Sequence, residues 1–145
     1  MSVRESIAEN IVTTLRDSVV LPVRVKYVTR EPFDFTKLSN AQFPAVLVRT
    51  AGEDREDSSL GGSIGQRMGS IDYELVCFVK AGIIDQARNN IIEAVEEGLE
   101  VDRTRGGNAI DTQITNIEVD EGSIDPVGGV ILTVRVVYQY TRGTT

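Results

Sequence analysis

Histidine is absent from this 145-residue sequence, and cysteine occurs once, as Cys77. Without histidine the chain cannot provide the Ser-His or Cys-His pairs of nucleophilic catalysis, or the imidazole ligands of zinc sites. A single cysteine cannot form an internal disulfide. Because Cys77 lies in the apolar run LVCFV and no histidine exists to activate it, we interpret it as a small buried hydrophobic residue.

Long apolar runs are absent as well. The sequence has no stretch of about 18 apolar residues, so it predicts no membrane-spanning helix. The N-terminal stretch MSVRESIAENIVTTLRDSVV carries acidic and polar residues throughout and lacks the apolar centre of a secretory signal. We therefore expect a soluble intracellular protein that does not associate with membranes.

Basic residues are too few to balance the acidic ones. Fifteen lysines and arginines face 22 aspartates and glutamates, a net charge of −7, which argues against a general affinity for nucleic-acid phosphates. Hydrophobic residues make up 41% and charged residues 26%, as is typical of globular proteins. The length fits one domain spanning residues 1–145.

Two segments carry the period of an amphipathic helix. The first starts at a capping-box pair, Ser2 and Glu5, and should end near residues 17–20, before Pro22. The second spans residues 83–102, with Asp85 as a plausible N-cap. Apolar residues recur at every fourth position of both: Val3, Ile7, Ile11 and Leu15 in the first, and Ala87, Ile91, Val95 and Leu99 in the second.

Five segments read as strands. They are VRVKYVTRE (23–31), AVLVRT (45–50), SIDYELVCFVKA (70–81), TQITNIEVDE (112–121) and VILTVRVVYQYT (130–141). The last two should pair as an antiparallel hairpin, because GSIDPVGG between them is a turn signal. The order of elements predicts an α+β fold, with a mainly antiparallel β-sheet and both helices packed on one face.

The segment from Pro32 to Pro44 lacks a clean period and is predicted to be a loop with a short helical turn around residues 36–38. Its three aromatic residues, Phe33, Phe35 and Phe43, are most simply anchors that hold the loop on the core. An exposed aromatic docking patch is the alternative interpretation.

The stretch DREDSSLGGSIGQRMGS (54–70) offers two candidate ligand sites, and both fail. GGSIG lacks the lysine of a Walker loop and leads into a strand rather than a helix. Arg55 interrupts the acids of residues 53–57, which do not match a calcium loop, and neither do Asp120, Glu121 and Asp125. Arg103 and Arg105, beside Gly106 and Gly107, could bind a phosphate, but we interpret them as residues of a solvated turn. We predict no catalytic residue, no metal ligand and no cofactor.

The length of the same connection is its main feature. About 18 residues separate two strands, Gly52 to Gly69, far more than an ordinary hairpin loop holds. AGEDRED and IGQRMGS can prolong the strands into a protruding β-arm with its tip at residues 58–65. A charged arm suits contact with another subunit. The predicted interface residues are Glu53, Asp54, Arg55, Glu56, Asp57, Ser58, Gly61, Gly62, Gln66, Arg67 and Met68.

This layout resembles the tail terminator proteins of long-tailed bacteriophages. The segments that carry the likeness are FPAVLVRTAGEDRED, GSIDYELVCFVKA, the helix from Asp85 to Glu100 and the ending GGVILTVRVVYQYTRG. The likeness covers nearly the whole chain, and it lies in the order and texture of the elements rather than in one diagnostic motif.

The resemblance implies a structural virion protein of the tail or neck, assembled in the host cytoplasm, that is neither an enzyme nor a cofactor binder. It implies a homohexameric ring that caps the tail tube, ends its growth and meets the neck or head-tail connector. The sheath protein is a further candidate partner. Genome DNA would pass through the ring without specific binding, and acidic side chains on the channel wall would keep it from sticking.

Other functions stay open at this point. A different neck or tail-completion protein has a similar size and mixture of elements. A small acidic hydrolase that uses carboxylates and a metal is an alternative from another class, because an acidic chain offers many carboxylate pairs. A host binding module with an exposed aromatic patch is a third. Deleting residues 58–65 should leave the monomer folded but impair assembly if the arm is the interface.

Overall fold

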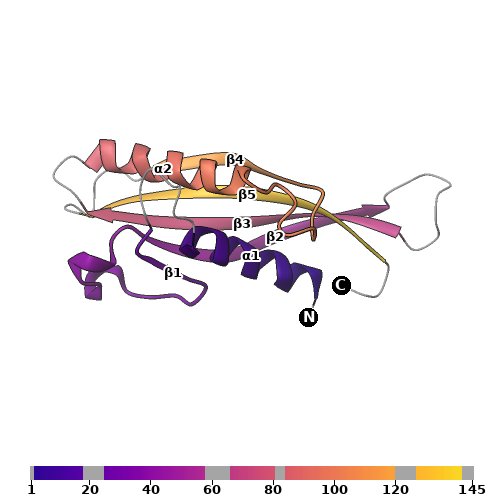
Figure 1. The fold of residues 1–145 in the computed structure, drawn as a ribbon, viewed down its shortest axis with the longest axis horizontal. Coiled ribbons are helices and arrows are strands. Elements are labelled where there is room, and N and C mark those ends of the chain that lie inside the picture. Colours follow the sequence, from indigo (N-terminus) through magenta and orange to yellow (C-terminus); the bar gives the residue numbers. More distant parts are fainter. Residues whose placement is uncertain (1, 18–24, 58–65, 81–83, 120–126, 142–145) are drawn as a thin grey trace.

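The computed structural model describes residues 2–17, 25–57, 66–80, 84–119 and 127–141. Within these ranges two helices and five strands follow one another, with two short 3-10 turns before the second strand (Figure 1). The elements are α1 (Val3–Asp17), β1 (Tyr27–Thr29), the turns Phe35–Lys37 and Asn40–Gln42, β2 (Ala45–Asp57), β3 (Gln66–Lys80), α2 (Ile84–Glu100), β4 (Asp111–Val119) and β5 (Val127–Thr141).

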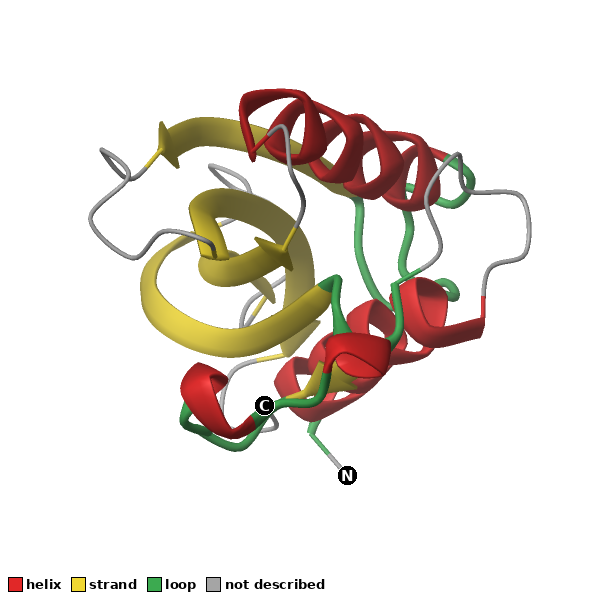
Figure 2. Cartoon of the chain, turned by 90° about the vertical axis from the view of Figure 1, so that its left-hand side faces the viewer, coloured by secondary structure: helices red, strands yellow, loops and turns green. Residues whose placement is uncertain are grey.

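The five strands form one sheet in the order β1-β2-β3-β5-β4. The pairs β2–β3, β3–β5 and β5–β4 are antiparallel, and only the short β1 runs parallel to its neighbour β2. The sheet curls strongly when it is viewed along its strands, as Figure 2 shows, and both helices lie on the same side of the curl. The predicted α+β fold with a mainly antiparallel sheet is therefore confirmed.

The core lies between the helices and one face of the sheet. Alternate residues of β3, from Ile71 to Val79, and of β5, from Val130 to Tyr140, point to this face and are buried. The apolar stripes of both helices pack on them, and Ile7, Ile11 and Ile91 are fully buried. Cys77 belongs to this core, and burial raises the pKa of its thiol to about 12. The interpretation of Cys77 as a buried apolar residue is confirmed.

The first strand is shorter than its alternating pattern predicts. Within the described part of the predicted segment only Tyr27–Thr29 pairs. Tyr27 lies opposite Ala45, the first residue of β2, so the residues before it have no partner in β2, and after Thr29 the chain leaves the sheet. The loop that follows is held by aromatic contacts. The Phe33 ring meets those of Tyr27 and Phe78 with centroids 5.4 and 5.7 Å apart, and Phe43 is buried. Phe33 and Phe43 are therefore loop anchors as predicted. The side chain of Phe35 lies outside the described residues.

The edge strand β4 contains a β-bulge that the sequence pattern does not indicate. Its register against β5 shifts between Ile114 and Asn116, so Thr115 is the extra residue. Before the bulge Ile114 lies opposite the core residue Val134, and after it Ile117 lies opposite Leu132. Ile117 nevertheless stays 43% exposed, because it sits on the last strand of the sheet.

Candidate interface on the β-arm

The predicted β-arm exists and extends the main sheet. β2 and β3 stay paired in antiparallel register out to Asp57 opposite Arg67. Figure 1 shows this end of the sheet reaching beyond both helices. The arm has a third strand that was not predicted to belong to it, because β5 accompanies β3 as far as Thr141 opposite Gln66. We define the arm as residues 53–57 of β2, 66–69 of β3 and 138–141 of β5.

A buried carboxylate fixes the base of the arm. The Glu53 side chain is only 8% exposed, and one of its oxygens lies 2.9 Å from the Arg4 Nε of α1. Its other oxygen accepts a hydrogen bond from the Tyr138 hydroxyl at 2.8 Å and one from the Arg55 Nε. A carboxylate that leaves water needs such cationic and hydrogen-bonding partners. Glu53 therefore ties three chain segments together, and its contacts are internal to this chain.

The position next to this carboxylate has no room for a side chain. A Cβ atom on Gly69 would lie 2.7 Å from the Tyr138 Cε1 and 2.9 Å from the Glu53 Oε2. Real Cβ atoms do not approach other heavy atoms so closely, so a substitution must push the tyrosine ring or the carboxylate aside. Glycine at this point of β3 leaves room for the ring of Tyr138, which belongs to the residue directly opposite on β5.

The inner face of the arm is the face that continues the core side of the sheet. Aromatic rings cover it, where in the body the helices cover the sheet. The Arg55 guanidinium lies 4.6 Å from the centroid of the Tyr140 ring, a cation–π contact. The rings of Tyr138 and Tyr140 are 5.6 Å apart. The hydrogen bond to Glu53, together with its charge, raises the pKa of Arg55 above the ordinary arginine value. The inner face of the arm is thus occupied by its own side chains.

The outer face of the arm carries two exposed acidic side chains. Asp54 and Glu56 alternate with the inward-facing Glu53 and Arg55, so they point to the opposite side, and both are exposed. Arg67 and Met68 on β3 are half-buried. The predicted interface set is therefore divided between the two faces, and Asp54 and Glu56 are its members best placed for contact.

Several predicted interface residues lie outside the described part of the chain. Ser58, Gly61 and Gly62 fall between the described ends of β2 and β3. For Asp57 and Gln66 only the backbone is described, and it is paired in the sheet.

The turn after α2 corrects one interpretation. Arg103 is solvent-accessible and binds the Asp111 carboxylate at 2.7 Å, but Arg105 is fully buried rather than solvated. Its Nη2 donates to the carbonyl oxygen of Leu99 at 2.6 Å and to that of Asp102, so it provides hydrogen bonds for backbone carbonyl groups at the end of α2. Its φ of 50° places it in the left-handed region. Burial lowers the pKa of Arg105 below the ordinary arginine value.

The described residues contain neither a metal-binding cluster nor a membrane-spanning helix. Among them, no group of three or more His, Cys, Asp or Glu residues is arranged to hold a metal ion. The acids Asp120, Glu121 and Asp125 lie outside this part of the chain. No described helix has the length and apolar character that crossing a membrane requires.

Comparison with known proteins gives a likeness in fold. No protein-family model matches the sequence, and no curated protein matches it either. Among solved structures, a chain of the virion of a native gene transfer agent particle is similar, with a TM-score of 0.56 and 11% sequence identity. The match covers 95% of this chain and 98% of that chain. The two proteins therefore share a fold over nearly their whole lengths.

Proposed function

We propose that this chain is a structural protein of a phage-like virion, and more specifically a tail terminator that forms a homohexameric ring on the end of the tail tube. The observation that carries the virion role is the end-to-end fold likeness to a chain of a gene transfer agent virion. The terminator role rests on the resemblance of the element order to that family, together with the arm.

The arm supports an assembly role through its two unlike faces. Its inner face is held by the buried Glu53 and the tyrosines, so the arm keeps a defined shape without a partner. Its outer face presents Asp54 and Glu56 to solvent. A preordered charged element of this kind favours register and specificity when subunits associate. In this proposal the arm contacts the next subunit or the tail tube.

The number of copies that associate, in solution and on the tail tube, tests whether the chain forms a ring. Purified chain, alone and with preassembled tail tubes, would be examined by native mass spectrometry and electron microscopy. We expect six copies per tube end and tubes that no longer elongate. A chain that binds the neck or connector and leaves tube growth unchanged would instead identify another neck or tail-completion protein.

A charge-reversal pair tests the arm separately. The variant Asp54→Lys/Glu56→Lys changes only exposed side chains, so it should fold normally but lose ring formation or tube capping. The matched control Glu31→Lys/Glu93→Lys reverses two exposed charges away from the arm and should assemble like the unmodified chain. Equal assembly of both variants would remove the arm from the interface.

A further inference from the structure

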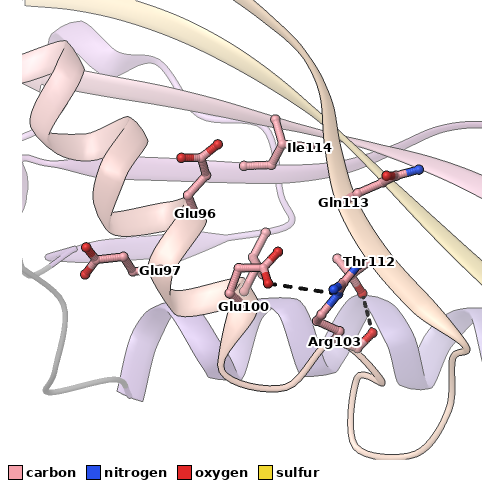
Figure 3. A pocket seen from close by; sticks show the side chains of 8 residues that line it. Glu96, Glu97, Glu100, Arg103, Thr112, Gln113 and Ile114 are labelled. Carbon is pink, nitrogen blue, oxygen red and sulfur yellow. Dashed lines mark hydrogen bonds and ion pairs between the residues drawn. The ribbon is translucent and has the colours of Figure 1, made fainter.

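A second surface, separate from the arm, has the features of a peptide-binding groove. A hollow of about 430 Å³ lies between the C-terminal half of α2 and the strand β4. Figure 3 shows the residues that line it. Those that matter here are Glu96, Leu99 and Glu100 on α2, and Thr112, Gln113 and Ile114 on β4. We call this hollow the α2–β4 groove.

The groove runs along the edge of the sheet. Thr112 and Ile114 lie opposite the core residues Val136 and Val134, whereas Gln113 lies opposite Arg135 on the outer face. A hollow that touches both sets of β4 residues therefore lies at the strand's edge rather than over one face. β4 is the last strand of the sheet, so within the described residues no further strand covers this edge. Alternate N–H and C=O groups of an edge strand point outward, ready to pair with an added strand.

The charge of the groove selects the kind of strand. Glu96, Glu97 and Glu100 are all exposed on the α2 side. Arg103 is the basic residue among the described lining residues, and it already binds Asp111 at 2.7 Å and lies 3.9 Å from Glu100. The groove therefore keeps an excess of negative charge beside an open strand edge.

The floor of the groove is apolar, whereas its rim is acidic. Leu99 is 4% exposed, and Ile114 packs against the core from the β4 side. Figure 3 shows Glu96 and Glu100 on the side of Ile114 and Arg103, while Glu97 points away from them. A lysine or arginine side chain suits this arrangement, because its methylene stem can cover the apolar floor while its charged end reaches a carboxylate.

We propose that the β4 edge and the α2–β4 groove bind an extended basic segment of a partner protein, which adds to the sheet as a sixth strand. A second copy of this chain fits less well, because the chain as a whole carries a net charge of −7 and would meet the acidic groove with like charge. The inference concerns a surface other than the arm and does not depend on the ring.

Synthetic peptides test the proposal on the full chain. The probe is a nine-residue peptide, as long as β4, that alternates lysine with valine, and the control replaces each lysine with glutamate. We expect the basic peptide to bind, to weaken as salt rises, and to slow amide hydrogen exchange in Asp111–Val119. Equal binding of both peptides, or binding without protection of β4, would overturn the proposal.

Backbone methylation separates strand pairing from simple charge attraction. Two further basic peptides carry N-methyl groups at either the odd or the even positions. An added strand uses only one of these two sets of N–H groups, so one methylated peptide should lose binding and the other should keep it. Loss in neither peptide would mean that the contact is electrostatic alone, and would overturn the pairing.

Paired substitutions locate the contact. The variant Glu96→Gln/Glu100→Gln should weaken binding of the basic peptide by about tenfold, since it removes two exposed charge partners. The control Glu9→Gln/Glu31→Gln removes the same charge outside both the groove and the arm and should bind within about twofold of the unmodified chain. Equal weakening by both variants would place the peptide elsewhere.

Discussion

The strands β2, β3 and β5 run through two regions that are stabilised in different ways. In the body both helices cover their inner face, and the contacts are apolar, such as Leu75 and Leu132 against the helix stripes. In the arm no described helix covers that face beyond the contact of Arg4 on α1, and Glu53 with its tyrosine and arginine partners occupies it. One set of strands can thus be held by buried apolar area at one end and by a polar network at the other.

The largest expected effect comes from the body. Leu75→Ala removes a fully buried side chain from the centre of the core, and it should lower the free energy of unfolding by about 2–5 kcal/mol. Urea denaturation would measure this loss. The control Val76→Ala changes the next residue, which is half-buried on the opposite face, and should cost roughly 1 kcal/mol or less. Equal losses would contradict the one-sided core.

A smaller effect is expected at the base of the arm. Gly69→Ala forces a Cβ atom against Tyr138 and Glu53, and should cost up to about 3 kcal/mol. Hydrogen exchange should accelerate in the arm and stay slow in the body. Gly52→Ala is the matched control, because a Cβ atom at Gly52 meets nothing within 4 Å. A near-neutral Gly69→Ala would show that the tyrosine ring is free to move away.

Removing the charge of the buried Glu53 carboxylate should also destabilise the arm, by a smaller amount. Glu53→Gln leaves Arg4 and Arg55 without their anion, at a cost of about 1–2 kcal/mol, since both arginines are partly exposed. Thermal unfolding together with exchange of the arm amides would report the loss. Glu56→Gln, an exposed acid three residues away, should change stability by no more than about 0.5 kcal/mol.

The smallest effect is a dependence on pH in the turn after α2. Hydrogen bonds from the Thr104 hydroxyl and from the Gly106 and Thr104 amides lower the pKa of Asp102 below its ordinary value of 3.8. A lowered folded-state pKa contributes stability above 3.8, and this contribution is lost as the pH falls through that value and below. Acid titration of unfolding should be shallower in Asp102→Asn. An unchanged titration would show that the turn does not contribute.

Much of the body could be predicted from the sequence, because its helices and central strands bury one regular face each. The period of four in α1 and α2 and the alternation in β3 and β5 follow directly from that burial. The arm strands were also predictable, since the connection is too long for a simple loop. The partners of Glu53 were not, because Arg4 and Tyr138 are distant in sequence and nothing local marks them.

Two further features escaped prediction for physical reasons. The bulge in β4 adds one residue to a strand that is mostly exposed, so the residue pattern there carries no clear alternation. Arg105 is buried because it satisfies carbonyl groups at the end of α2. Its sequence neighbours, Gly106 and Gly107, indicate only a turn. In both places the deciding feature involves backbone groups, the register of β4 and the carbonyl groups at the end of α2, and the pattern of residue types does not show them.

The continuous pairing of β3 has a mechanical consequence. β3 spans 15 residues, roughly 50 Å, and β2 and β5 flank it from the arm into the body. A pull on the arm along the strand axis would load many interstrand hydrogen bonds at once, in shear, instead of breaking them one after another. Such an arm should resist extension along its length, and a force applied at its end would pass through the strands to the core under the two helices.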